Sequence, residues 1–156
     1  MRDRTVPCIG SRCICDHGGV PAKAKELRFA VDLGADATLR TEDGTPLALD
    51  DAWTPEHVLL AALVRCSLKS LRYHASRAGL QVDSATGAAS SLVTRRDGDG
   101  RYAVVEAAVE LAVELEPQPG ADELAELLAN AERDCFVGAS LRAAPAYRWT
   151  VNGAEV

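Results

Sequence analysis

The segment from Thr54 to Gly79 limits the fold more than any other part of the chain. Thr54 is a typical N-cap, Pro55 suits the first helical position and Gly79 suits the residue after a helix, so the pattern predicts one long helix. Residues 58–64 are apolar on all sides, which is typical of a helix that is buried all round. A chain of 156 residues has little structure of its own to cover such a helix, which indicates a partner subunit.

Alternating residues and turn signals on both sides of this helix predict strands. The run Asp97-Gly98-Asp99-Gly100 predicts a tight turn between the arms of a hairpin. We predict an α+β fold with antiparallel sheet and the order βββαββααβ. The strands are expected at residues 26–33, 37–41, 45–49, 80–96, 101–115 and 147–151, and the helices from Thr54, from Asp122 and, as a short segment, from Cys135.

Charge and hydropathy exclude several kinds of partner. The formal net charge is −6 and basic residues cluster at most in pairs such as Arg95–Arg96, so no nucleic acid is expected. The sequence has no apolar run of about 18 residues, so no membrane is expected either. Because no apolar signal segment follows the N-terminus, we expect a cytoplasmic location.

Three of the five cysteines lie in residues 1–25, which we interpret as a Cys-rich extension that precedes a single domain at residues 26–156. In a reducing compartment an odd number of cysteines argues against a static disulfide framework. A zinc site in the extension is one hypothesis, but the ligand spacing differs from the usual Cys-x2–4-Cys, so we expect no cofactor. The candidate ligands are Cys8, Cys13, Cys15 and His17.

The other two cysteines, Cys66 and Cys135, stand apart from this cluster. A cysteine on an apolar helix face, as Cys66 is beside Leu59 and Leu63, is most often a core residue. A reactive cysteine needs a cation or a helix N-terminus that favours its thiolate. Cys135 opens the short helical segment and meets that requirement. The residues alone leave both roles open for both cysteines.

Three stretches, in this order and spacing, resemble the OsmC/Ohr family of thiol-dependent hydroperoxide reductases. The turn Gly34–Ala37 is similar to a Gly-Arg-Asp-Gly turn of the family. TPEHVLLAALVRC at residues 54–66 is similar to the family's helix with a glutamate ten residues before its cysteine, and AERDCFVGASL at residues 131–141 to its second cysteine motif. The resemblance covers about residues 27–151.

The resemblance implies an intertwined homodimer in which antiparallel sheets wrap long central helices and the active sites lie at the subunit interface. It implies that Cys66 is the peroxidatic cysteine, which an organic hydroperoxide oxidises to a sulfenic acid. Cys135 is then the resolving cysteine that forms the disulfide, and a dithiol or other thiol reductant restores both thiols. We therefore predict a cysteine-based organic hydroperoxide reductase that acts in oxidative-stress defence.

Two residues depart from the family pattern. Phe136 replaces the proline that usually follows the second cysteine. Ala35 stands where peroxidase members carry the arginine that holds the thiolate, and Arg28 and Arg40 on the first two strands are the candidate substitutes. Without such an arginine, the alternative is a non-peroxidase protein of the same fold that binds a small molecule or senses redox state.

Glu56 is the third catalytic candidate that the resemblance implies. It precedes Cys66 by ten residues, which is a rise of ~15 Å along a helix, so it would act through an arginine or across the dimer. Its simpler role is that of a first-turn carboxylate in the favourable field of the helix dipole. Both roles stay open.

Overall fold

The computed structural model describes residues 26–156, in two compact units that divide between Ala48 and Leu49. In the first unit, three short strands form an antiparallel sheet in sequence order: β1 (Val31–Leu33), β2 (Leu39–Thr41) and β3 (Pro46–Leu47). The three expected strands are present but shorter than predicted. Residues 26–30 lie outside the β1–β2 ladder, and Ala37 belongs to the turn because its φ is 57°.

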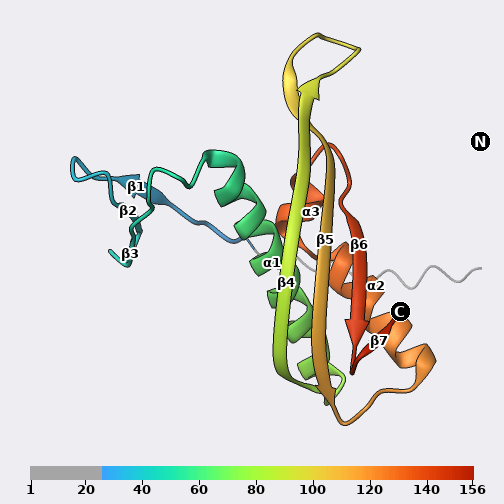
Figure 1. Cartoon of the computed structure of the whole chain (residues 1–156). Coiled ribbons are helices and arrows are strands. Elements are labelled where there is room, and N and C mark those ends of the chain that lie inside the picture. The colour runs from blue at the N-terminus through green and yellow to red at the C-terminus, as the bar shows by residue number, and fades with distance from the viewer. Residues whose placement is uncertain (1–25) are drawn as a thin grey trace, which may run out of the picture. The chain divides into compact units, whose positions relative to one another are not determined.

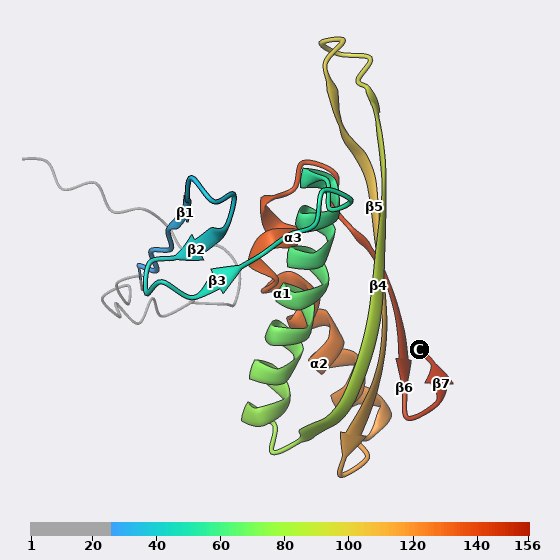
Figure 2. The same ribbon diagram turned by 60° about the vertical axis from the view of Figure 1, so that its left-hand side comes forward.

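The second unit is a four-stranded sheet with its helices on one face (Figures 1 and 2). The order of helices and strands along the chain agrees with the prediction, and a two-residue strand, β7, follows at the end. The elements are α1 (Pro55–Arg77), β4 (Gln81–Arg95), β5 (Tyr102–Glu116), α2 (Ala121–Arg133), α3 (Phe136–Ser140), β6 (Ala146–Val151) and β7 (Ala154–Glu155).

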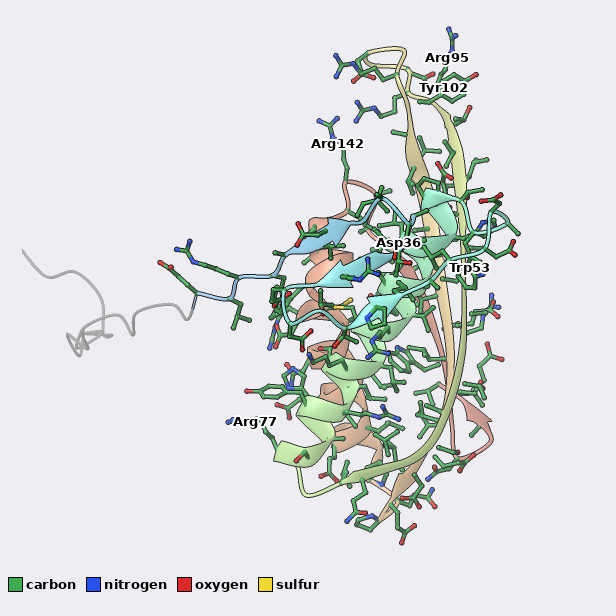
Figure 3. The ribbon with its side chains drawn as sticks, turned by 90° about the vertical axis from the view of Figure 1, so that its left-hand side faces the viewer. Asp36, Trp53, Arg77, Arg95, Tyr102 and Arg142 are labelled. Carbon is green, nitrogen blue, oxygen red and sulfur yellow. The ribbon has the colours of Figure 1, made fainter. Side chains whose placement is uncertain are left out.

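The sheet is mixed, which differs from the antiparallel arrangement that we expected. β4 and β5 form a long antiparallel hairpin, at whose far end Arg95 lies 5.3 Å from the ring of Tyr102 (Figure 3). β6 pairs with β5 in parallel, because α2 and α3 carry the chain back along the helical face before β6 begins. Asn152, at a φ of 50°, then turns the chain into β7 and anchors the turn by accepting the N–H of Leu115 at 2.7 Å.

The core lies between this sheet and its helices. Alternate residues of β5 from Ala107 to Leu115 are buried and the glutamates between them are exposed, so the segment is a strand, as predicted. Burying one such valine or leucine side chain stabilises the fold by about 1.5–3 kcal/mol. The helices contribute Leu63, Leu71, Leu127, Leu128 and Ala131 to the same core.

α1 begins and ends where the sequence predicted. The Thr54 N–H donates to Nδ1 of His57 at 3.2 Å and fixes the first turn, and Gly79 follows the helix with a φ of 78°. The sequence predicted burial on all sides for segment 58–64, but a single copy covers only one side of it. Leu63 is buried, whereas Ala61 and Ala62 are exposed. No helix within residues 26–156 is long and apolar enough to cross a membrane.

Gly87 allows α1 and β5 to pack closely around β4. A Cβ atom at this position would lie 2.6 Å from Cδ2 of Leu111 and 3.1 Å from Cγ1 of Val64. Both distances are too short for ordinary contact, so only glycine fits without movement of its neighbours.

We expect Gly87→Ala to lower the free energy of unfolding by about 1–3 kcal/mol, because the added methyl group overpacks this contact. Urea denaturation at one fixed protein concentration measures the change. Gly98→Ala is the matched control, since nothing lies within 4 Å of its Cβ position and its φ is not positive. Equal stability of the two variants would show that the close approach at Gly87 is not tight.

Candidate functional site

The fold brings together the two cysteines that the sequence singled out. Cys66 lies on α1, and Cys135 lies between α2 and α3 as the N-cap of α3. The N–H of Val137 donates to Sγ of Cys66 at 3.5 Å, and each thiol is among the groups that shift the pKa of the other. Both are free thiols, so they form an adjacent reduced pair.

Cys66 is the more accessible member of the pair and the less acidic one. Burial raises the pKa of its thiol, and the neighbouring Cys135 raises it further, while the N–H groups of Val137 and Phe136 oppose the shift. The second N–H exists because residue 136 departs from the family's proline, which has no N–H to donate. The peptide at the start of α3 therefore supplies part of the stabilisation that a thiolate needs.

Cys135 is fully buried, with 0% of its surface exposed, yet its pKa is lowered. Burial acts to raise the pKa, but the Ser67 hydroxyl, the N–H of Gly138, the Tyr147 hydroxyl and the Cys66 thiol together outweigh it. The Ser67 oxygen and the Gly138 nitrogen each lie 3.4 Å from the Cys135 sulfur. The first turn of α3 thus contributes one N–H, as the sequence predicted, and side chains contribute the rest.

A line of side chains fixes the two hydroxyl groups. The Ser67 hydroxyl donates to the carbonyl oxygen of Leu63 at 2.9 Å and lies 3.2 Å from the Tyr147 hydroxyl. The Tyr147 ring stacks on Trp149 at 6.1 Å, with 7° between the ring planes. Nε1 of Trp149 in turn donates to Glu132 on α2 at 2.7 Å. Burial raises the pKa of Tyr147 to about 12, so its phenol stays protonated near neutral pH.

Ser67 and Tyr147 are the site residues that the sequence interpretation missed. Ser67 had a weak signal, because it follows Leu63 by one turn on the buried side of α1 and a buried hydroxyl needs a partner. Tyr147 had none, since its partner Ser67 is 80 residues away in the sequence.

A second polar contact holds α1 against the residue before Cys135. Nε2 of His74 lies 2.9 Å from Oδ2 of Asp134, whose other oxygen accepts Nε of Arg133 at 2.8 Å. Arg133 and then His74 lower the pKa of Asp134. The contact fixes the end of α2 on α1, so it also fixes the position of Cys135.

The structure pairs the remaining candidates with groups of their own. Its own backbone N–H and then the Thr54 hydroxyl lower the pKa of Glu56, as expected of a first-turn carboxylate. Arg28 precedes β1 rather than lying on it, and pairs with Glu26 at 3.1 Å. Arg40 on β2 forms a fork with Asp36, at 2.6 and 3.1 Å, and lowers the pKa of that carboxyl to about 2 (Figure 3 marks Asp36). Both arginines belong to the first unit and both cysteines to the second.

The candidate metal ligands Cys8, Cys13, Cys15 and His17 lie outside the described residues. Between residues 26 and 156, no three His, Cys, Asp or Glu side chains are grouped so that they could hold a metal ion.

The chain is thus an α+β protein with helices on one face of a mixed sheet. Its two neighbouring thiols lie on α1 and at the start of α3. A family model described as OsmC-like protein matches residues 48–150. The chain therefore belongs to the OsmC-like family. A comparison with curated proteins found no match.

Solved structures share the fold. An OsmC-like protein of unknown function from Vibrio cholerae has a TM-score of 0.62 and 17% identity, over 72% of this chain and 82% of its own. An OsmC-like protein from Mycoplasma pneumoniae has a TM-score of 0.61 and 14% identity, over 81% and 97%. A putative organic hydroperoxide resistance protein from Vibrio cholerae, with captopril bound in one of its active sites, has a TM-score of 0.57 and 19% identity, over 86% and 98%.

The adjacent thiols predict that diamide, an oxidant that needs no peroxidase chemistry, converts the reduced protein to a Cys66–Cys135 disulfide. Mass spectrometry should show the loss of two hydrogen atoms and one cross-linked peptide pair. Cys135→Ser removes one partner and should leave Cys66 unlinked. A cross-link from Cys66 to a cysteine of the N-terminal cluster instead would contradict the geometry.

Proposed function

We propose that the chain is a cysteine-based organic hydroperoxide reductase, a thiol-dependent peroxidase of oxidative-stress defence in the cytoplasm. The observation that carries the proposal is the adjacent pair of one partly accessible thiol, Cys66, and one buried thiol, Cys135. Such a pair suits a cycle in which the accessible thiol meets the substrate and the buried one resolves the product. The relative named as a putative organic hydroperoxide resistance protein supports the same activity.

In the proposed cycle the Cys66 thiolate attacks the terminal oxygen of the hydroperoxide, the O–O bond breaks and an alcohol leaves. Cys66 is then a sulfenic acid, and the Cys135 thiolate attacks its sulfur and releases hydroxide, which leaves a disulfide. A dithiol or other thiol reductant restores the two thiols. No cofactor takes part.

The raised pKa of Cys66 sets a condition on this activity. The thiolate is the nucleophile, so the rate should be low near neutral pH and rise as pH increases through the Cys66 titration. An arginine beside the sulfur would shift that rise to lower pH. We propose that Glu56 would position such an arginine if one were present. With Ala35 at the family's arginine position, we expect this chain to reduce hydroperoxide slowly near neutral pH.

A second candidate function is redox sensing, which the adjacent pair of free thiols supports because a disulfide can form between them. A sensor needs to form the disulfide once, whereas a peroxidase turns over with its reductant. Multiple turnovers of hydroperoxide per protein chain therefore distinguish the enzyme from the sensor.

We expect reduced protein to consume cumene hydroperoxide over many turnovers when dihydrolipoamide is present. Cys66→Ser should abolish consumption, because it removes the nucleophile. Cys135→Ser should keep the first turnover and leave Cys66 as a sulfenic acid that is open to over-oxidation. A ferrous xylenol orange assay follows the peroxide, and consumption no faster than in buffer would exclude the reductase.

Ala35→Arg tests the missing cation. It should raise the rate near neutral pH and move the pH profile of the rate to lower pH, because a cation stabilises the thiolate. Ala37→Arg, two residues along the same turn, is the control for added charge alone, although its positive φ makes it the more strained variant. Equal pH profiles for the wild type and Ala35→Arg would remove the arginine from the explanation.

We also propose that the active form is a homodimer. In one copy, apolar side chains stay uncovered on the first half of α1, where Ala61 is exposed, and on the hairpin, where Leu92 is 47% and Tyr102 is 68% exposed. Exposed apolar surface of this extent on adjacent elements marks an association surface. A second copy would supply the cover that the sequence of the helix requires.

Sedimentation at about 1 µM chain should show a dimer and no folded monomer, as expected of an obligate dimer. Ala61→Glu should weaken the dimer, because it places a charge on the apolar surface. Arg72→Glu, on the exposed polar side of the same helix, should not. A stable wild-type monomer at this concentration would disprove the obligate dimer.

A further inference from the structure

The two sulfur atoms differ in the hydrogen-bond donors around them, and this difference assigns them different parts in disulfide reduction. We infer that Ser67 and Tyr147 are positioning residues that hold Cys135 as the leaving thiolate when the disulfide between the two cysteines is reduced. In this arrangement the reducing thiol attacks the sulfur of Cys66. The inference rests on the proposed peroxidase cycle, which forms that disulfide.

Access to the two sulfurs gives the first reason. Cys135 has no exposed surface and packs in the hydrophobic core, whereas Cys66 is partly exposed. A thiol from solution therefore reaches the Cys66 side of the bond. Attack there makes Cys135 the leaving group.

The Ser67 hydroxyl gives the second reason, because it has two acceptors within reach. It lies 2.9 Å from the Leu63 carbonyl oxygen and 3.4 Å from the Cys135 sulfur. While Cys135 is a thiol, the hydroxyl donates to the carbonyl and can accept the S–H. When Cys135 becomes a thiolate, rotation about one bond turns the same O–H toward the sulfur. Such a donor follows the charge as it forms.

Tyr147 supplies a second hydroxyl that cannot itself ionise at neutral pH, because burial raises its pKa to about 12. Its hydroxyl lies 3.2 Å from the Ser67 oxygen and is one of the groups that favour the Cys135 thiolate. Stacking on Trp149 holds the ring in place. The donor is thus already oriented before the disulfide breaks.

The reduction step balances as a thiol–disulfide exchange. A thiolate of the reducing dithiol forms a bond to the Cys66 sulfur, the Cys66–Cys135 bond breaks, and its electron pair stays on Cys135 as a thiolate. The second thiol of the reductant then loses its proton to water and attacks the reductant sulfur that is bonded to Cys66. A disulfide forms within the reductant, the bond to Cys66 breaks, and Cys66 leaves as a thiolate that takes up a proton. The dithiol is oxidised by two electrons and the protein disulfide is reduced. A more acidic leaving thiol speeds this direction and makes the disulfide easier to reduce.

A titration of the full chain labelled with cysteine-3-¹³C tests the positions of the donors. The Cβ signals report ionisation without any need for reagent access, and Cys66→Ser and Cys135→Ser assign them. We expect Cys135 to ionise at lower pH than Cys66, and Ser67→Ala to move the Cys135 midpoint to higher pH. Ser70→Ala is the matched control, since this serine is also buried on α1 and, among the described residues, its hydroxyl has no hydrogen-bond partner.

The equilibrium constant for reduction by dithiothreitol gives an independent measurement. Loss of a hydrogen bond to a charged sulfur should lower it about tenfold in Ser67→Ala. The decrease in this equilibrium constant should be seen at pH values above the wild-type Cys135 titration midpoint and should disappear at lower pH, where no thiolate forms. A merely structural defect would not follow that pH profile. Tyr147→Phe should act in the same direction, and Tyr73→Phe, which alters an exposed tyrosine of α1, should not.

Trapping locates the attacked sulfur. Oxidised protein quenched during reaction with glutathione should carry the mixed disulfide on Cys66. A mixed disulfide on Cys135, a Cys135 midpoint at or above that of Cys66, or a wild-type titration in Ser67→Ala would each overturn the inference. Failure to consume hydroperoxide, with these results intact, would instead overturn the proposed peroxidase and leave a protein whose disulfide is reduced through Cys66.

Discussion

The packing of one side of α1 against β4, β5 and α2 determines the rest of the second unit. Leu63, Ser67, Leu71 and Ala75 follow each other at intervals of four residues and are all buried. Three of them are apolar, so the hydrophobic effect fixes the helix on the sheet, and Gly87 lets it approach closely. The one hydroxyl in this row is carried into the core by its neighbours. Because a buried hydroxyl without a partner is costly, its contacts with Leu63, Cys135 and Tyr147 are a consequence of how the helix packs.

Burial acts in the same direction on the two cysteines, yet their pKa values shift in opposite directions. Desolvation disfavours both thiolates, so the difference between them comes from the donors around each sulfur and from the interaction of the two thiols with each other. Cys66 has N–H groups from the peptide at the start of α3, and these leave its pKa raised. Cys135 has two hydroxyl groups and an N–H, and together with the Cys66 thiol these lower its pKa. The buried Cys135 is therefore the more acidic thiol, which suits a leaving group. Cys66 is the more accessible thiol, which suits the nucleophile that meets the hydroperoxide.

The features that the sequence predicted correctly depend on local rules. Caps at Thr54 and Gly79 set the ends of α1, and the turn at residues 97–100 set the hairpin. The lengths of β1–β3, the parallel pairing of β6 and the strand β7 depend on partners that local patterns do not specify. The site divides in the same way. A family motif was enough to single out Cys66 and Cys135, but Ser67 meets Tyr147 only through packing across 80 residues.

The departure at residue 136 connects the peptide backbone to the chemistry of the first thiol. Proline there would leave Cys66 with the N–H of Val137 but without that of residue 136, so the backbone would stabilise the thiolate less. With Phe136 the backbone shares that task, though it does not overcome burial, since the pKa of Cys66 stays raised. Both candidate substitute arginines are already paired with carboxylates, Arg28 with Glu26 and Arg40 with Asp36. Either of these arginines would have to leave its carboxylate in order to serve a thiolate, and exposed ion pairs are weak enough to allow such an exchange.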